Sequence, residues 1–248
     1  MKGLCSISFR LLSVDEIIKI CKESGIEAIE WGGDVHVPPT DLKNAIEVGN
    51  KTRSAGLTTP SYGSYYRLDG GDFESVSETA KALGTSVIRV WAGNRDSEQT
   101  SEEEYSRLVS DLKRCADIAE KNDQTICFEY HYGTYCNGAD STLKLISDAN
   151  RKNVKTYWQP MYWLNGKVDN EKAENLSSIK NLNEFIENIH VYNWVGRVRL
   201  PLANATDEWR EYAELLGKER VYYLEFMPLD EVNALTAESK ALADILTK

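Results

Sequence analysis

The sequence has no long apolar run, and its cysteine pattern gives little indication of disulfide bonds or structural metal sites. None of its apolar stretches approaches the roughly 20 residues that a membrane-spanning helix needs, so no membrane span is expected. The segment Met1–Arg10 lacks a long apolar stretch with a small-residue cleavage site, which argues against a signal peptide. The five cysteines are odd in number and show no C-x-x-C spacing, which disfavours a disulfide framework and a structural zinc site. We therefore expect a cytoplasmic protein with no membrane partner.

Positive charge is also scarce. The 248 residues include 29 lysines and arginines against 39 aspartates and glutamates, a formal net charge of −10 at pH 7. Because phosphate neutralisation by basic side chains dominates nucleic-acid binding, this charge disfavours DNA or RNA as a partner. The composition, with 42% hydrophobic and 27% charged residues, is typical of a globular protein with a sizeable core.

Short β-type runs alternate with amphipathic helical stretches along the whole chain. The expected strands begin near Leu4, Ala28, Leu57, Val87, Thr125, Lys155, Ile189 and Val221. The expected helices cover residues 14–24, 40–55, 73–83, 101–121, 141–150, 171–187, 207–216 and 231–247. The repeat is roughly 30 residues, the size of a βα unit. Eight such units predict an α/β fold of the (β/α)8 TIM barrel type, with residues 1–248 forming a single domain.

Helix boundaries support this division of the chain. The segments Ser13–Glu16 and Ser101–Glu104 both fit a capping box at a helix start. A glycine stands between a helical stretch and the next strand at Gly25, Gly56, Gly84 and Gly217. The competing fold is an open doubly wound sheet, which often carries a glycine-rich phosphate loop after its first strand. The segment Ser6–Arg10 is not such a loop.

Four polar side chains occupy the C-terminal ends of the last four expected strands. Glu129 and Glu225 end apolar runs, where a buried carboxylate is costly without a compensating metal, cation or donor. His190 and Gln159 occupy the equivalent positions on the strands between them. Because the C-terminal ends of barrel strands meet at one opening, we expect these side chains to converge there. Two carboxylates, an imidazole and an amide oxygen suit Mn²⁺ or Mg²⁺, with Co²⁺ or Zn²⁺ as alternatives.

Eight short motifs, in order and spacing, carry a resemblance to a known family. They are Ile7–Ser13, Gly25–Gly32, Ser61–Arg67, Ile88–Gly93, Phe128–His131, Tyr157–Pro160, His190–Trp194 and Leu224–Phe226. With these motifs the chain resembles the xylose isomerase-like barrel superfamily, in its sugar phosphate isomerase/epimerase branch. The resemblance extends over nearly the whole chain.

The resemblance implies an isomerase, a sugar or sugar phosphate isomerase or epimerase that depends on one divalent metal ion, Mn²⁺ first. In ketose 3-epimerases of this type the two glutamates, here Glu129 and Glu225, also serve as the catalytic acid/base pair. They would take a proton from beside a carbonyl and return it, while the metal stabilises the enediolate. The implied partner is a small sugar or related hydroxyketone. Relatives commonly form homo-dimers or homo-tetramers.

One position departs from the family pattern. The sixth strand usually presents an aspartate followed three residues later by a histidine, whereas this chain has Gln159 and Tyr162. A neutral amide in place of an anion lowers the negative charge of the site. We expect weaker metal binding, and the departure leaves the identity of the metal open.

Further residues are predicted to contact the substrate. His131 follows Glu129 by two residues, so its side chain lies on the same face of the strand. Aromatic rings at strand ends, such as Trp91, can pack on the C–H faces of a sugar. The resemblance adds a histidine after the second strand and a cation in the loop after the seventh. The predicted substrate-binding set is His36, Arg67, Trp91, His131, Arg197 and Arg199, with one of the last two arginines expected to serve.

Other functions on the same barrel stay open. Abasic-site endonucleases of the superfamily use three zinc ions and many histidines, and an acidic chain with three histidines does not fit them. A keto-inositol dehydratase and a hydroxypyruvate isomerase begin with the same kind of proton abstraction. A catalytically degenerate barrel that binds a sugar without turnover is the non-enzymatic alternative.

Overall fold

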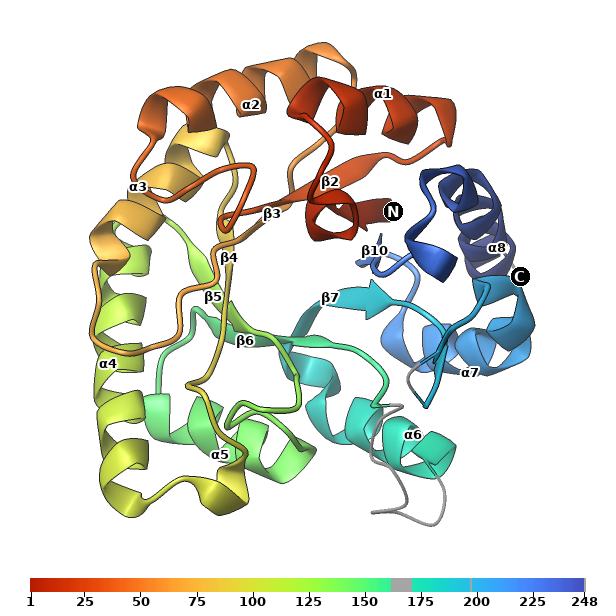
Figure 1. The fold of residues 1–248 in the computed structure, drawn as a ribbon. Helices are drawn as coiled ribbons and strands as arrows, with labels where there is room; N and C mark the ends of the chain where they lie inside the picture. The colour runs from red at the N-terminus through yellow and green to blue at the C-terminus, as the bar shows by residue number, and fades with distance from the viewer. Residues whose placement is uncertain (162–170, 197, 248) are drawn as a thin grey trace.

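Eight parallel strands pair edge to edge until the last meets the first (Figure 1). The computed structural model describes residues 1–161, 171–196 and 198–247. The barrel strands are β1 (Lys2–Cys5), β2 (Ala28–Gly32), β3 (Ser61–Gly63), β4 (Val87–Val90), β5 (Thr125–Phe128), β6 (Val154–Trp158), β7 (Ile186–Val191) and β10 (Val221–Leu224). The ring closes because β1 pairs in parallel with both β2 and β10. The predicted (β/α)8 barrel is confirmed.

A helix follows each barrel strand and packs outside the ring. These helices are α1 (Val14–Glu23), α2 (Leu42–Ser54), α3 (Phe73–Leu83), α4 (Glu102–Glu120), α5 (Ala139–Ala149), α6 (Glu171–Leu182), α7 (Thr206–Leu216) and α8 (Leu235–Thr247). Within the described part of the chain, no helix is long and apolar enough to cross a membrane.

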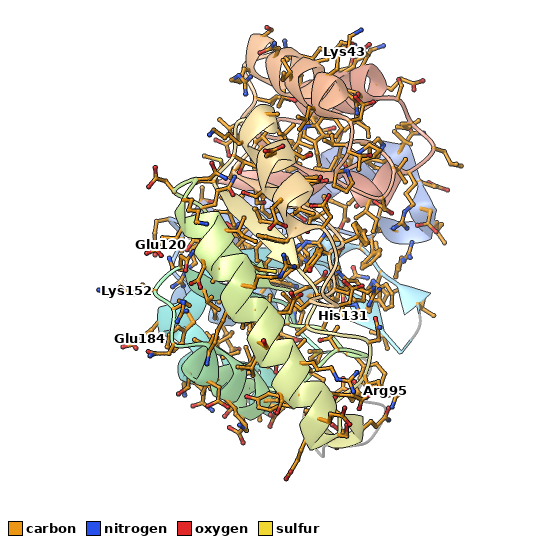
Figure 2. The ribbon with its side chains drawn as sticks, turned by 90° about the vertical axis from the view of Figure 1, so that its left-hand side faces the viewer. Lys43, Arg95, Glu120, His131, Lys152 and Glu184 are labelled. Atoms are coloured by element: carbon orange, nitrogen blue, oxygen red, sulfur yellow. The ribbon has the colours of Figure 1, made fainter. Side chains whose placement is uncertain are left out.

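The two ends of the barrel differ, because one of them bears an additional hairpin. A two-stranded antiparallel hairpin, β8 (Trp194–Val195) and β9 (Val198–Arg199), projects from the loop after β7. In Figure 2 the labelled His131 lies toward the side of this hairpin, whereas Glu120, Lys152 and Glu184 lie on the other side. The C-terminal ends of the strands open on the hairpin side, where the candidate ligands were predicted to meet.

Helix starts and stops follow the expected chemistry. Ser13 with Glu16, and Ser101 with Glu104, both form complete capping boxes. Gly84 ends α3 at φ 91°, a left-handed conformation that a residue with a Cβ rarely adopts. The boundaries predicted from these residues are confirmed.

Element boundaries were predicted wrongly at the third strand and at the junction between α6 and β7. The third strand begins at Ser61 rather than near Leu57, because Pro60 interrupts the run and Thr58 makes only an isolated bridge to Ala28. The helix expected over residues 171–187 ends at Leu182, and β7 begins at Ile186 rather than near Ile189. Residues 183–188 are mostly polar and contain no proline or glycine, so the sequence does not show where the helix ends.

The space inside the ring is aromatic and polar rather than aliphatic. Tyr157 and Tyr223 pack there with Cys5 and Cys127, separate from the larger core between strands and helices. Gly3 makes room for this filling, since a Cβ at Gly3 would lie 2.4 Å from the Tyr223 ring. The interior therefore offers hydroxyl groups directly beneath the mouth of the barrel.

Candidate active site

The structure brings the four predicted ligands together at the mouth. His190 lies in β7, while Glu129, Gln159 and Glu225 each follow the last residue of a strand. The Nδ1 atom of His190 lies 3.2 Å from Gln159 Oε1, 3.7 Å from Glu129 Oε1 and 3.4 Å from Glu225 Oε2. All four side chains are buried. Closure of the barrel, not sequence proximity, creates this cluster.

The donor set fits a divalent cation. Glu129, His190 and Glu225 can each present one ligand atom so that all three atoms lie within 4.8 Å of one another. Glu225 Oε2 is buried and has no hydrogen-bond partner among the described residues. An unpartnered buried carboxylate oxygen is costly unless a cation or donor meets it. Carboxylate, imidazole and amide ligands together are of the kind that Mn²⁺, Mg²⁺ or Zn²⁺ accept.

The electrostatics of the two carboxylates differ. Burial alone would raise the pKa of Glu129, but Arg89 together with His131 and His190 outweighs burial, so this pKa lies below its ordinary value. Burial raises the pKa of Glu225, and the negative charge of Glu129 raises it further, against the influence of His190. Burial would lower the pKa of His190, yet Glu225 and Glu30 raise it above the ordinary value. The protonation of each of these three groups therefore depends on the charges of the other two.

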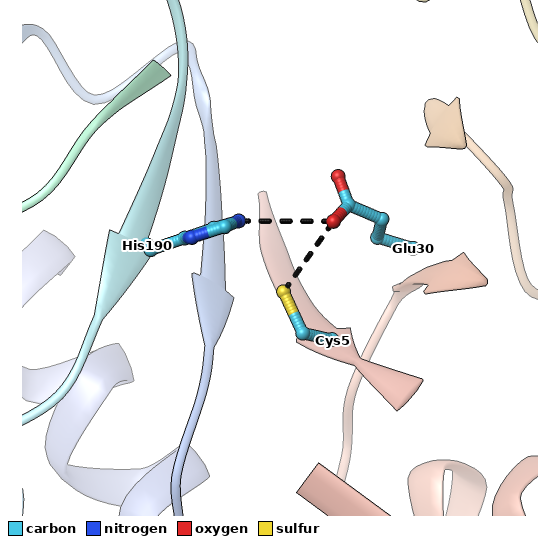
Figure 3. Close-up of side chains that lie close together, drawn as sticks. All are labelled: Cys5, Glu30 and His190. Atoms are coloured by element: carbon cyan, nitrogen blue, oxygen red, sulfur yellow. Dashed lines mark hydrogen bonds and ion pairs between the residues drawn. The ribbon is translucent and has the colours of Figure 1, made fainter. Parts of the chain in front are cut away.

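Two buried charged residues in this pocket were missed by the sequence analysis. Arg89 ion-pairs with Glu129 and, through Nε, with Glu30 Oε1 at 2.8 Å. The signal was present, because Glu30 and Arg89 interrupt the apolar strands β2 and β4 as Glu129 and Glu225 end theirs. Figure 3 shows Glu30 facing both His190 and Cys5. This trio forms a second cluster beneath the first.

Three of the predicted substrate contacts lie on one side of the mouth. The rings of Trp91 and His131 have centroids 4.8 Å apart, and the Arg67 guanidinium carbon lies 4.2 Å from the Trp91 centroid. Tyr65, which was not predicted, stacks on Trp91 with a centroid distance of 6.2 Å. A flat aromatic surface flanked by an imidazole and a guanidinium suits a hydroxylated ring or chain.

The other predicted contacts have different surroundings. His36 has both ring nitrogens engaged, with Ser6 Oγ at 3.0 Å and the Leu12 carbonyl oxygen at 3.1 Å. Arg199 ion-pairs with Asp230 and lies over the Phe226 ring at 4.8 Å. Arg197 and Tyr162 fall outside the described residues. The substrate roles of all these residues remain predictions.

Most of the chain matches a known protein family. Residues 18–199 match the family described as Xylose isomerase-like TIM barrel. A 3-dehydroshikimate dehydratase of Bacillus anthracis is 25% identical over 204 residues, which cover 77% of this chain and 71% of that protein.

Solved structures share the fold over nearly the whole chain. The probable 3-DHS dehydratase AsbF of Bacillus anthracis superposes with a TM-score of 0.81 at 21% identity, covering 98% of this chain and 99% of that one. The IOLI protein with a bound zinc atom gives 0.77 at 16% identity, covering 99% and 98%. A D-psicose 3-epimerase in the presence of D-fructose gives 0.70 at 14% identity, covering 98% and 96%.

Proposed function

The chain belongs to the Xylose isomerase-like TIM barrel family, and we propose that it is a divalent-metal-dependent enzyme that removes a proton beside the carbonyl of a small polyhydroxylated ketone. The observation that carries this proposal is the convergence of Glu129, His190 and Glu225 within 4.8 Å at the barrel mouth. A proton beside a carbonyl is too weakly acidic for an isolated carboxylate, so the developing negative charge needs a fixed positive partner.

The metal would be held by Glu129, Gln159, His190 and Glu225. Mn²⁺ or Mg²⁺ is the expected ion, with Zn²⁺ or Co²⁺ as alternatives. When bound, it supplies a Lewis acid toward the carbonyl oxygen. The two carboxylates then form the acid/base pair. Glu129 is already ion-paired with Arg89, while Glu225 Oε2 accepts no hydrogen bond from the described residues, so Glu225 is the group better placed to accept the proton.

Loss of water from a β-hydroxyketone is the outcome we favour. Glu225 accepts the proton next to the carbonyl, and the C–O bond at the β-carbon breaks with its electrons leaving on oxygen. Glu225 then returns the accepted proton to the leaving oxygen, so water is released and a conjugated ketone forms. The dehydratase relative in sequence and the dehydratase structure with a TM-score of 0.81 support this outcome.

Epimerisation of a ketose is the second candidate. It requires carboxylates that reach the substrate from two sides. Glu129 follows β5 and Glu225 follows β10, and β6 and β7 stand between these strands in the ring. The fold shared with a D-psicose 3-epimerase supports this alternative.

Deuterium wash-in with product analysis tests the proposal. The protein with Mn²⁺ is incubated in deuterated water with cyclic β-hydroxyketones, keto-inositols and ketoses. We expect exchange next to the carbonyl, and for the favoured outcome the ultraviolet absorbance of a conjugated ketone. Glu225→Gln should abolish both signals. Exchange that survives Glu129→Gln and Glu225→Gln would remove the proposed pair, and a new epimer without conjugated product would favour the second candidate.

A further inference from the structure

A buried ion pair lies directly beneath the proposed metal site. The side chains of Glu30 and Arg89 are 1% and 2% exposed, although both are charged. Burying two charges is expensive and is tolerated only with close pairing and further hydrogen bonds. Gly63 makes the space, because a Cβ there would lie 2.6 Å from Arg89 Nη2 and 3.0 Å from Glu30 Oε1. The barrel interior is therefore shaped around this pair.

Glu30 has both carboxylate oxygens occupied. Oε1 accepts from Arg89 Nε at 2.8 Å, and the Cys5 thiol lies 3.8 Å away. Oε2 accepts from Ser61 Oγ at 2.8 Å and Tyr157 OH at 2.7 Å. Donors from Arg89, Ser61 and Tyr157 already compensate the charge of this carboxylate, so it does not need a cation. The Cys5–Glu30–His190 cluster is thus a hydrogen-bonding hub and not a second metal site.

Glu30 also lies next to the His190 ring, on the side of its Nε2 atom. The Nδ1 atom points to the ligand oxygens of Glu129, Gln159 and Glu225. The Nε2 atom is buried without a hydrogen-bond partner among the described residues, and Glu30 Oε1 lies 3.7 Å from it (Figure 3). A metal can bind Nδ1 only when the ring proton is on Nε2, and a carboxylate behind Nε2 favours that tautomer.

Arg89 links Glu30 to a second proposed metal ligand, Glu129. Its Nη1 contacts Glu129 Oε2, while its Nε is held by Glu30. Glu129 Oε1, the oxygen nearer His190 Nδ1, is left to the ligand cluster. If Glu30 lost its charge, Glu129 would be the remaining carboxylate partner of the Arg89 guanidinium among these residues. Arg89 would then hold Glu129 more strongly and compete with the metal for it.

We infer that Glu30 is a positioning residue of the metal site, orienting His190 through Nε2 and balancing Arg89 so that Glu129 stays available as a ligand. This inference rests on the proposed metal site. Glu30 is not one of the proposed metal ligands or substrate contacts. Carboxylates behind metal-binding histidines typically change metal affinity by 10–100-fold when removed.

Metal affinity gives the first test, measured by calorimetry with Mn²⁺ on purified protein. Glu30→Gln should lower affinity about tenfold. The double variant Glu30→Gln with Arg89→Gln should recover part of that loss, because Glu129 is released from the guanidinium. Ser61→Ala removes a donor to Glu30 without touching His190 or Arg89, and should stay within about threefold of wild type. A double variant as weak as or weaker than Glu30→Gln would overturn the inference.

Imidazole resonances give a second test that needs no metal. The chain has three histidines, so replacing His36 and His131 in turn assigns the His190 signals. In the metal-free protein we expect an exchange-protected Nε2 proton on His190 that shifts strongly in Glu30→Gln and stays in place in Ser61→Ala. An unchanged signal in Glu30→Gln would overturn the inference. Wild-type protein that binds no metal would instead overturn the proposed function, while this signal still reports on Glu30.

Discussion

The Nδ1 atom of His190 lies 3.4 Å from Glu225 Oε2, linking the ends of the neighbouring strands β7 and β10 at the mouth of the barrel. This contact brings an imidazole to a carboxylate oxygen that accepts no hydrogen bond within the described part of the chain. The carboxylates of Glu225 and Glu129 both lie close to this imidazole and concentrate negative charge in a buried space. A cation bound there would stabilise the folded protein as well as enable chemistry.

Metal removal should therefore be visible in stability. We expect chelation to lower the melting temperature and Mn²⁺ to restore it, because a ligand that binds only the folded state adds about 2.7 kcal/mol at one hundred times its Kd. Differential scanning calorimetry with and without chelator measures the change. A His190→Ala variant serves as control, since its melting temperature should no longer respond to Mn²⁺. An equal response in this variant would place the metal elsewhere.

The two glutamates should behave differently when neutralised. Glu225→Gln removes a buried carboxylate with a raised pKa, so we expect little loss of stability but at least a ~100-fold loss of solvent exchange. Glu129→Gln also loses exchange, but it breaks a buried ion pair with Arg89 and should destabilise the metal-free fold by about 3 kcal/mol. Urea unfolding of both metal-free variants measures this contrast. Equal destabilisation would show that the Arg89 contact does not hold Glu129.

Glu238 should make stability depend on pH. Burial raises the pKa of this carboxyl to about 7, although it accepts a hydrogen bond from the Leu202 N–H. The folded protein therefore holds the proton more tightly than the unfolded chain, and this stabilisation is lost as pH rises from about 4.5 through 7.

Glu238→Gln should remove that loss. The variant should be more stable than wild type at pH 8 by on the order of 1 kcal/mol, after allowance for solvent screening. The difference should vanish near pH 4. Urea unfolding at both pH values checks this, with the exposed Glu214→Gln as a matched control. A pH-independent difference would assign the effect to packing.

His36 tests a substrate contact that was predicted from the resemblance. Both of its ring nitrogens meet protein partners, Ser6 and the Leu12 carbonyl. We expect His36→Ala to cost about 1–3 kcal/mol of stability, because those buried groups lose their partner. Its effect on KM should be small compared with that of His131→Ala. A large KM increase with unchanged stability would instead support direct contact with substrate.

Much of the fold and of the ligand cluster was predictable from local patterns. Alternating βα units, capping boxes at Ser13 and Ser101 and the glycine at Gly84 act within a few residues, so they are visible in the chain. The boundary between α6 and β7 was not, because the end of that helix depends on tertiary contacts. Arg220, for example, donates to the side chain and carbonyl of Asn183 at this junction.

The sequence by itself determined which strand ends carry Glu129, Gln159, His190 and Glu225, because a barrel of parallel strands must gather those ends at one mouth. Only the tertiary structure decided that Glu30 and Arg89, 59 residues apart, pair beneath them, and that His190 turns Nδ1 toward the ligands and Nε2 toward Glu30. The reason is physical. Strand periodicity fixes which face a side chain occupies, whereas side-chain reach and ring closure fix which partner it meets.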